Sequence, residues 1–475
     1  MGGAPLSLLS RVHRSQRAGS GAAIATFAIA IFNNWLLIAE SWIPVDWYGA
    51  SEALVLSPFI AGAVLSRIPS VILERRAGID DTPGDALRRE ARPMLVLFLP
   101  FLVLSAIDDL IAGNPGWIES TAAVGPIAMQ LQFFLLIAAI VLVSPLLVRR
   151  LYPAHPLPEG LLRQRLLAAS DACGVHCREI FVFRTGPRPI VNACLTGVLP
   201  FQRQVFLTDG LLETLDDKQV EGVFCHELGH GRRHHLLLYL LLALGFLEIL
   251  QLLDGALATF SQWWVATLFL SVTALFWIFF SKLSHHMEHE ADLFSAEAMG
   301  SPIPIASALQ TLEHLGQGRQ KKNWRHPPIP SRVHALFRWR FDPVFRESFG
   351  SKTRLLVATT ISITVVASLL LSWRTFDSRE GPWDEPIAIA GALLSQQEHS
   401  IHRPGRSAER EEEVLRRAEG RLHEALDLLE GAKGMARKRE LIYRQLALIY
   451  NHLDEPFNAA ACRWLSGIQR IREER

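Results

Sequence analysis

The sequence predicts a mainly α-helical, polytopic membrane protein with a small α/β domain inserted between its membrane helices. Three observations indicate this fold class: apolar segments of bilayer-spanning length, an uneven distribution of Arg and Lys between the loops, and short strand-like sequences between two apolar blocks. The formal net charge of +1 argues against a nucleic-acid-binding protein, because phosphate recognition needs a surplus of basic residues.

Seven apolar segments are each near the roughly 20 residues that cross a bilayer. They lie at roughly 21–43, 53–73, 94–112, 126–148, 236–258, 262–283 and 354–373. Arg and Lys flank some of these segments, whereas the connections 44–52 and 113–125 contain neither. The positive-inside rule therefore predicts that the N-terminus and residues 149–235 and 284–352 are cytoplasmic, and that the tail lies on the other side. The preference for Arg over Lys and the short outer loops suit a bacterial inner membrane.

These segments predict four parts of the chain. Residues 1–150 form an N-terminal membrane domain of about four helices, and 151–352 form the inserted domain, interrupted by a membrane hairpin at about 236–283. A seventh membrane helix follows at 353–374, and 384–475 form a helical tail.

Two of these parts have internal patterns. Within the inserted domain, three stretches rich in β-branched and aromatic residues predict strands at Ile180–Phe183, Pro189–Leu195 and Val205–Thr208. In the tail, Leu441–Leu465 has the spacing of a tetratricopeptide helix pair, which suits a protein partner. The alternative for the tail is a solvated helical cap on the membrane domain.

Residues 226–230 read HELGH. On a helix, His226 and His230 share a face and direct two imidazoles at one point, with Glu227 beside them. That arrangement is typical of a catalytic zinc with two nitrogen ligands and a carboxylate that is close but not coordinated. The helix is expected to continue straight into the next apolar segment, which would bring the metal within a few turns of the lipid boundary.

A third ligand is expected on the same side of the membrane, in the sequence SHHMEHEAD at 284–292. Glu288 is the best candidate, and Asp292 is spaced to accept a hydrogen bond from the second nitrogen of His226 or His230. Competing ligands in the same segment are His285, His286, His289 and Glu290.

These motifs resemble the membrane zinc endopeptidases that comprise HtpX and the CAAX prenyl protease of the yeast a-factor pathway, a gluzincin family. The family's second motif usually begins Ser-Arg, and His285 replaces that Arg here. Further elements that match are Asn192-Ala193, Thr208-Asp209-Gly210-Leu211-Leu212, and His326-Pro327-Pro328 followed by Arg332. The resemblance covers about residues 150 to 340, and the first three spans and the tail are not matched.

The resemblance implies a gluzincin metalloprotease domain in which His226, His230 and Glu288 hold one Zn²⁺ per chain. Glu227 would be the general base, and Asn192 and Ala193 would pair with substrate backbone on an edge strand. His326 or Arg332 would donate to the developing oxyanion. The alternative for both residues is a structural role, in which their contacts hold the loop against the core.

The implied function is hydrolysis of peptide bonds in membrane-associated proteins, with prenylated CAAX proteins and misfolded membrane proteins both open as substrates. The alternative is a non-catalytic membrane scaffold with a structural zinc and a partner-binding tail. The intact Glu227 disfavours it, because a structural zinc has no use for a free carboxylate.

Overall fold

A computed structural model describes residues 126–473 apart from 186–189, 258–261, 316–324, 378–381, 401–407, 431 and 433–434. Before residue 126 it describes 25–30, 35–43, 49–66 and shorter stretches. The chain divides into two units, one formed by Ile137–Trp373 and one formed by Met1–Leu136 together with Arg374–Arg475.

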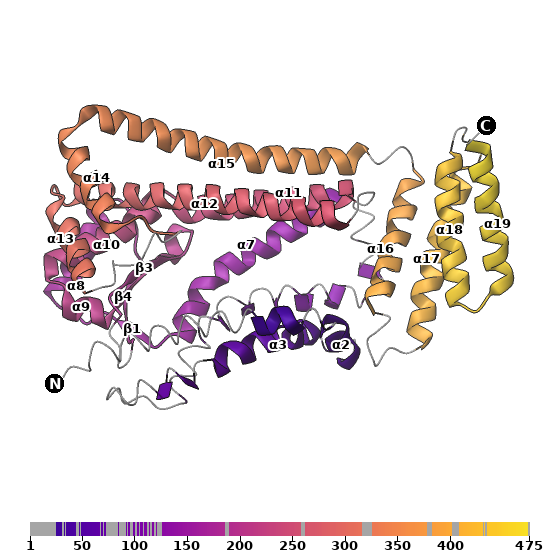
Figure 1. The fold of residues 1–475 in the computed structure, drawn as a ribbon, viewed down its shortest axis with the longest axis horizontal. Coiled ribbons are helices and arrows are strands. Elements are labelled where there is room, and N and C mark those ends of the chain that lie inside the picture. Colours follow the sequence, from indigo (N-terminus) through magenta and orange to yellow (C-terminus); the bar gives the residue numbers. More distant parts are fainter. Residues whose placement is uncertain are drawn as a thin grey trace. The chain divides into compact units, whose positions relative to one another are not determined.

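The unit Ile137–Trp373 contains a four-stranded sheet in the order β1-β2-β4-β3 (Figure 1). The strands are β1 (Ala154–Pro156), β2 (Glu179–Phe183), β3 (Ala193–Thr196) and β4 (Gln204–Thr208). The two central strands, β2 and β4, are parallel, and both outer pairings are antiparallel. Strands β2, β3 and β4 were predicted, although β3 begins later than expected. Strand β1 was not, because three residues that include a proline carry no strand pattern.

Helix α10 (Asp217–Arg232) carries the HELGH motif and begins at a capping box, in which the Asp216 side chain and the Gln219 backbone N–H are paired. Its apolar residues Val220, Phe224 and Leu228 recur every four positions, so they share one face. That face packs into the core beneath the sheet, together with α8 (Leu161–Ala172). The next helix after β4 is the short α9 (Asp209–Thr214), capped by Thr208.

The expected continuity between α10 and the following membrane helix is wrong. Helix α10 ends at Arg232, and α11 (His235–Leu257) begins as a separate helix. His234 has a φ of 57°, in the left-handed region that interrupts a right-handed helix. The break turns the chain so that His235, the first residue of α11, is fully buried.

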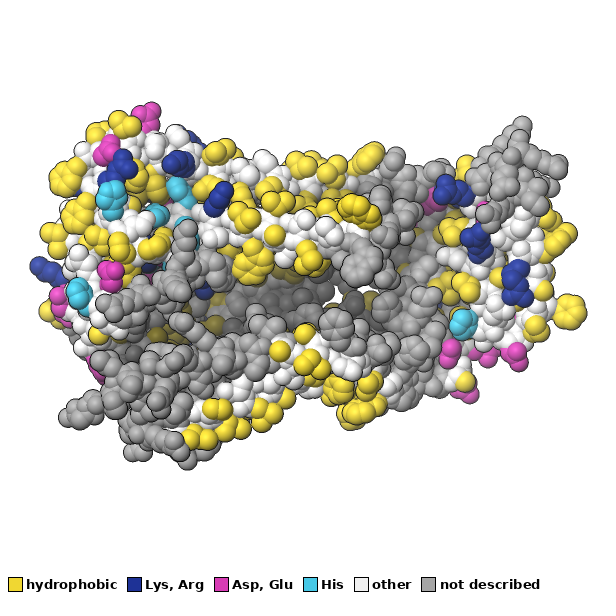
Figure 2. All heavy atoms as spheres, in the orientation of Figure 1, with side chains coloured by type: hydrophobic (Ala, Val, Ile, Leu, Met, Phe, Trp, Pro, Cys, Tyr) yellow, Lys and Arg dark blue, Asp and Glu magenta, His cyan; other side chains and the backbone are white. Residues whose placement is uncertain are grey.

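Three described helices are long and apolar enough to cross a membrane, with candidate spans at His235–Leu253, Thr267–Ala298 and Pro343–Trp373. They belong to α11, α12 (Gln262–Ala298) and α15 (Pro343–Asp377), which run side by side in Figure 1. The Thr364 hydroxyl donates to the Leu241 carbonyl at 2.7 Å and so joins α15 to α11. Figure 2 shows hydrophobic side chains along the outer faces of these helices, as expected for contact with lipid.

Helix α12 is one continuous element of 37 residues. It therefore contains both the predicted span at 262–283 and the polar sequence 284–292. The inserted domain is completed by α13 (Ile303–His314) and α14 (Ile329–Phe341), whose apolar faces pack against the polar end of α12.

The predicted spans at 21–43 and 94–112 lie partly outside the described residues. Near the second predicted span the structure has α3 (Ala50–Leu65), an apolar helix of 16 residues, preceded by α2 (Trp35–Trp42). The fourth predicted span lies within α7 (Pro126–Leu151).

The tail forms α16 (Asp384–Ser400), α17 (Ala408–Leu428), α18 (Ala436–His452) and α19 (Pro456–Glu473). These helices share an apolar core that includes Leu393, Leu422 and Leu446. The predicted tetratricopeptide-like pair coincides with α18 and α19, joined by a turn in which Asp454 has a φ of 56°. A partner for this helical tail stays a prediction.

Helices α10 and α12 approach closely at Gly229. A Cβ at this position would lie 3.1 Å from Ala291 Cα and 3.2 Å from Phe294 Cβ. We therefore expect Gly229→Val to push the helices apart and to lower the stability of the domain by about 1–3 kcal/mol, the usual cost of overpacking. Thermal unfolding of the detergent-solubilised protein measures this.

The matched control is Gly350→Val in α15, where only Arg354 Nη1 comes within 4 Å of an added Cβ, at 3.7 Å. The control should leave the unfolding midpoint near that of the wild type. Equal midpoints for Gly229→Val and the wild type would contradict the expected close packing.

Candidate metal centre

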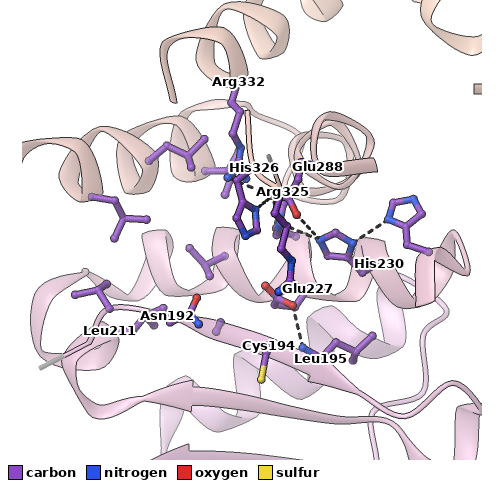
Figure 3. A pocket seen from close by; sticks show the side chains of 18 of the residues that line it. Asn192, Cys194, Leu195, Leu211, Glu227, His230, Glu288, Arg325, His326 and Arg332 are labelled. Carbon is purple, nitrogen blue, oxygen red and sulfur yellow. Dashed lines mark hydrogen bonds and ion pairs between the residues drawn. The ribbon is translucent and has the colours of Figure 1, made fainter. Parts of the chain in front are cut away.

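The side chains of His226, His230 and Glu288 converge where α10 meets α12 (Figure 3). The two imidazole Nε2 atoms are 3.3 Å apart. Glu288 Oε2 lies 3.8 Å from His226 Nε2, and Glu288 Oε1 lies 3.6 Å from His230 Nε2. Among the residues that the structure describes, this is the one group of three or more His, Cys, Asp or Glu side chains with metal-site geometry.

The three side chains fit zinc. Ligand atoms about 2.0–2.1 Å from a tetrahedral zinc lie about 3.3 Å from one another, which is the observed separation of the imidazole nitrogens and close to the two carboxylate distances. His226 and Glu288 are each 6% exposed, so the ligand atoms that converge at this site are largely shielded from water. Burial, reinforced by the charge of His226, holds the pKa of His230 well below its usual value, which favours the neutral imidazole that a metal requires.

The second nitrogen of His226 contacts Asp292. His226 Nδ1 lies 2.9 Å from Asp292 Oδ1, so of the two histidines it is His226 that Asp292 orients. Burial alone would lower the pKa of His226, but the hydrogen bond and charge of Asp292 raise it above the ordinary value. Arg332, on α14, donates from Nε to Asp292 Oδ2 at 2.7 Å and from Nη2 to Oδ1 at 2.6 Å.

The two predicted oxyanion donors both contact carboxylates. His326 Nδ1 lies 3.0 Å from Glu288 Oε2, and Arg332 Nη1 lies 3.4 Å from the same atom. Arg332 is 9% exposed and is held by Asp292, whereas the His326 side chain is 44% exposed and lies beside the cavity. The geometry therefore favours the structural alternative for Arg332, and an oxyanion role for His326 stays a prediction.

Glu227 lies beside the cluster and contacts the sheet edge. The Leu195 backbone N–H donates to Glu227 Oε2 at 2.9 Å, which connects α10 to the outer edge of β3. Burial raises the pKa of Glu227 to about 7, an effect that the nearby His226 charge opposes. A carboxylate with that pKa both accepts and releases a proton near neutral pH.

Asn192 and Ala193 lie where β3 begins, at the edge of the sheet, as predicted. The Asn192 backbone is tied to Thr208, whose N–H donates to the Asn192 carbonyl at 3.0 Å. Along a strand, backbone groups two residues apart point the same way, so the N–H of Ala193 faces outward like that of Leu195. Among the described residues, the outer edge of β3 at Ala193 pairs with no further strand.

The three converging side chains, Glu227 and the first residues of β3 line a cavity of about 320 Å³. One part carries the three converging side chains and Glu227, and another is apolar, with Leu211, Val223, Ile305, Leu309 and Leu312. Figure 3 shows Leu211 and Asn192 on the side of the cavity away from His230.

The sequence interpretation missed several cavity residues, including the charged or titratable side chains of Arg325 and His235. Arg325 directly precedes the predicted His326, and His235 follows the HELGH motif by five residues. Their only sequence signal was proximity to a motif residue.

Two of the competing ligands in the 284–292 segment, His286 and Glu290, contact other residues. His286 Nε2 lies 2.6 Å from the Thr353 hydroxyl, and its ring stacks on Phe349. Glu290 contacts His235. Glu288 is the member of the segment whose carboxylate lies close to the Nε2 atoms of both His226 and His230.

Comparison with known proteins gives the family. The sequence model of peptidase family M48 matches residues 156–340. A protease HtpX homolog from Campylobacter hominis is 27% identical over 284 residues, which is 55% of this chain and 94% of that protein. A protease HtpX homolog from Tropheryma whipplei (strain Twist) is 29% identical over 181 residues, 34% of this chain and 61% of that protein.

Among solved structures, the crystal structure of S. mikatae Ste24p aligns with a TM-score of 0.45 and 19% identity, covering 60% of this chain and 75% of that one. The family predicted from the motifs is confirmed by the M48 match and the HtpX relatives. Residues 156–340 match the peptidase family M48, and over that part the chain is similar to HtpX-type membrane proteases.

Proposed function

We propose that this protein is a zinc-dependent endopeptidase that cleaves membrane-associated proteins, with Glu227 as the general base. The observation that carries the proposal is the convergence of His226, His230 and Glu288 at ligand spacing, with the Glu227 carboxylate close to them but outside the set. A structural zinc site has four protein ligands and no such neighbour, whereas three protein ligands leave a position open for chemistry.

Zinc held by these three side chains would supply Lewis-acid activation of water and of the scissile carbonyl. Glu227 would take the proton of the attacking water and then return it to the leaving amine. The hydrogen bond from the Leu195 N–H fixes the carboxylate between the ligand cluster and the sheet edge, so the same contact positions base and substrate strand. The exposed His326 is the proposed donor to the developing oxyanion.

The substrate would bind as an extra strand along β3. This edge strand begins at Ala193, and pairing with substrate backbone needs no particular side chain on the substrate. A peptide bound there would lie over the cavity, with its scissile bond near Glu227. Asn192 and Ala193 are the residues proposed to hold it.

The membrane arrangement is proposed from charge and length. The seven proposed spans follow from the lengths of the apolar segments, and the cytoplasmic zinc site follows from the positive-inside rule. The preference for Arg over Lys and the short outer loops favour a bacterial inner membrane. Helix α12 supports a site near the lipid boundary, because Glu288 lies on the same helix as the predicted span at 262–283 and only five residues beyond it. Membrane-embedded or membrane-anchored chains are therefore the proposed substrate class, and the helical tail is the proposed surface for a protein partner.

Metal content tests the ligand set. Purified wild-type protein is expected to hold one zinc per chain, and Glu288→Ala should lower this to well below half, because two imidazoles alone leave the site short of a charged ligand. The matched control is His285→Ala, three residues earlier on the same helix, which should keep the wild-type zinc content. Full zinc occupancy in Glu288→Ala with loss in His285→Ala would transfer the ligand role to His285.

Cleavage of casein tests the activity itself. The purified protein should cleave it, a chelator should abolish the cleavage, and added zinc should restore it. A protein with one zinc per chain that cleaves neither casein nor a membrane-protein substrate would favour the scaffold alternative.

A further inference from the structure

A chain of hydrogen bonds leads away from His230 on the side opposite Glu288 (Figure 3). His230 Nδ1 lies 2.9 Å from His235 Nδ1, and His235 Nε2 lies 3.1 Å from Glu290 Oε2. Arg233 Nε lies 3.5 Å from the other carboxylate oxygen of Glu290. His235 has an exposure of 0%. Neither His235 nor Glu290 takes part in the mechanism above.

The positions of the protons in this chain follow from the geometry. His230 presents Nε2 to the metal site, so its remaining proton is on Nδ1. His235 Nδ1 must then accept that hydrogen bond, because two N–H groups cannot face each other at 2.9 Å. The proton of neutral His235 is consequently on Nε2, where it is donated to the Glu290 carboxylate. One arrangement of protons satisfies both contacts.

This chain of contacts links α10, which carries His230, through the start of α11 to α12. His235 reaches His230 because the left-handed turn at His234 starts α11 immediately after α10. Glu290 lies two residues after Glu288 on α12, and Asp292 lies four residues after it. The segment 288–292 of α12 thus supplies a proposed ligand, the carboxylate that contacts His226 and the carboxylate that contacts His235.

We propose that His235 and Glu290 are positioning residues that fix the tautomer and ring orientation of His230 for zinc binding. The inference rests on the proposed zinc site. In this arrangement the two proposed histidine ligands have different environments. The second nitrogen of His226 contacts the Asp292 carboxylate directly, whereas that of His230 contacts the imidazole of His235, which in turn contacts the Glu290 carboxylate.

Zinc affinity of the full chain in detergent, measured by competition with a chelating dye, tests the inference. His235→Leu removes the acceptor and should weaken zinc binding by about 10–100-fold. His235→Asn places an amide oxygen where Nδ1 was and should bind zinc at least about fivefold more tightly than His235→Leu. Glu290→Ala, which leaves His235 in place without its acceptor, should give an intermediate loss.

The matched control is His286→Leu, which removes a partly buried histidine on α12 whose partners are Thr353 and Phe349. Its zinc affinity should equal that of the wild type. The visible spectrum of the cobalt-substituted protein gives a second readout, because reorientation of a ligand changes the metal's absorption while a distant packing defect does not. The spectrum should change in His235→Leu and stay unchanged in His286→Leu.

Wild-type zinc affinity in both His235→Leu and Glu290→Ala would overturn the proposal, and so would equal weakening in His235→Leu and His235→Asn. If His235→Leu does not fold, the zinc affinity of Glu290→Ala relative to that of the wild type tests the proposal instead. Failure of the proposed function can be distinguished from failure of this inference. A protein that binds zinc tightly but cleaves no peptide would still show these differences in zinc affinity among the variants.

Discussion

Glu227→Gln is expected to lower kcat/KM for peptide cleavage by a factor of about 10²–10⁴, the range that a general base contributes. Gln has nearly the same shape as Glu and can still accept the hydrogen bond from the Leu195 N–H, so the position of the side chain is kept. What it loses is the ability to take a proton from water. The measurement is the rate of cleavage of casein or a membrane-protein substrate at equal zinc content.

Zinc content separates loss of the base from loss of the site. Glu227→Gln should retain one zinc per chain, since Glu227 is not a member of the ligand cluster. Glu221→Gln is the matched control on the same helix: its carboxylate pairs with Arg165, away from the cavity. It should cleave at close to the wild-type rate. Undiminished cleavage by Glu227→Gln would remove the proposed base.

Arg332→Met is expected to destabilise the protease domain by about 3–5 kcal/mol, the cost of removing one partner from a buried ion pair. Asp292 is 1% exposed, and Arg332 supplies two of its hydrogen bonds. Without the guanidinium, a buried carboxylate would keep only His226 and the more distant charges. Thermal unfolding in detergent measures the loss.

A double variant and a control identify the source of that loss. Asp292→Asn combined with Arg332→Met removes the unpaired charge while the amide oxygen still accepts from His226 Nδ1, so it should be more stable than Arg332→Met alone. Arg338→Met is the control on the same helix. It breaks the exposed pair with Asp342, which is expected to contribute less than about 1 kcal/mol. Similar effects of the two single variants would contradict the importance of burial.

The parts of the fold that sequence could predict are those set by local pattern. The apolar lengths of α11, α12 and α15 and the β-branched runs of β2 and β4 are properties of contiguous residues. The same is true of the start of α10, because Asp216 and Gln219 form their capping box within one turn. The break at His234 could not be predicted, because HGRRHH contains no proline and its one glycine lies earlier.

The ligand cluster was predictable for a different reason. His226 and His230 are four residues apart on one helix, and charge placement put 284–292 on the same side of the membrane. Which histidine Asp292 contacts was not predictable, because it depends on how α10 and α12 cross, and that crossing is set by the contact at Gly229. The same holds for His235 and Arg325, which reach the cavity through turns rather than through helical periodicity. The roles of the individual site residues stay predictions until variants are measured.

Because α12 is continuous, Glu288 and the predicted membrane span at 262–283 belong to one helix. A helix of 37 residues is about 55 Å long and behaves as a stiff rod over that length. Glu288 stands near one end of the rod, and lipid surrounds the other. A soluble fragment made by excising the membrane hairpin would therefore cut the helix that positions this carboxylate. A change in helix tilt with bilayer thickness would displace Glu288 relative to His226 and His230, the other proposed zinc ligands.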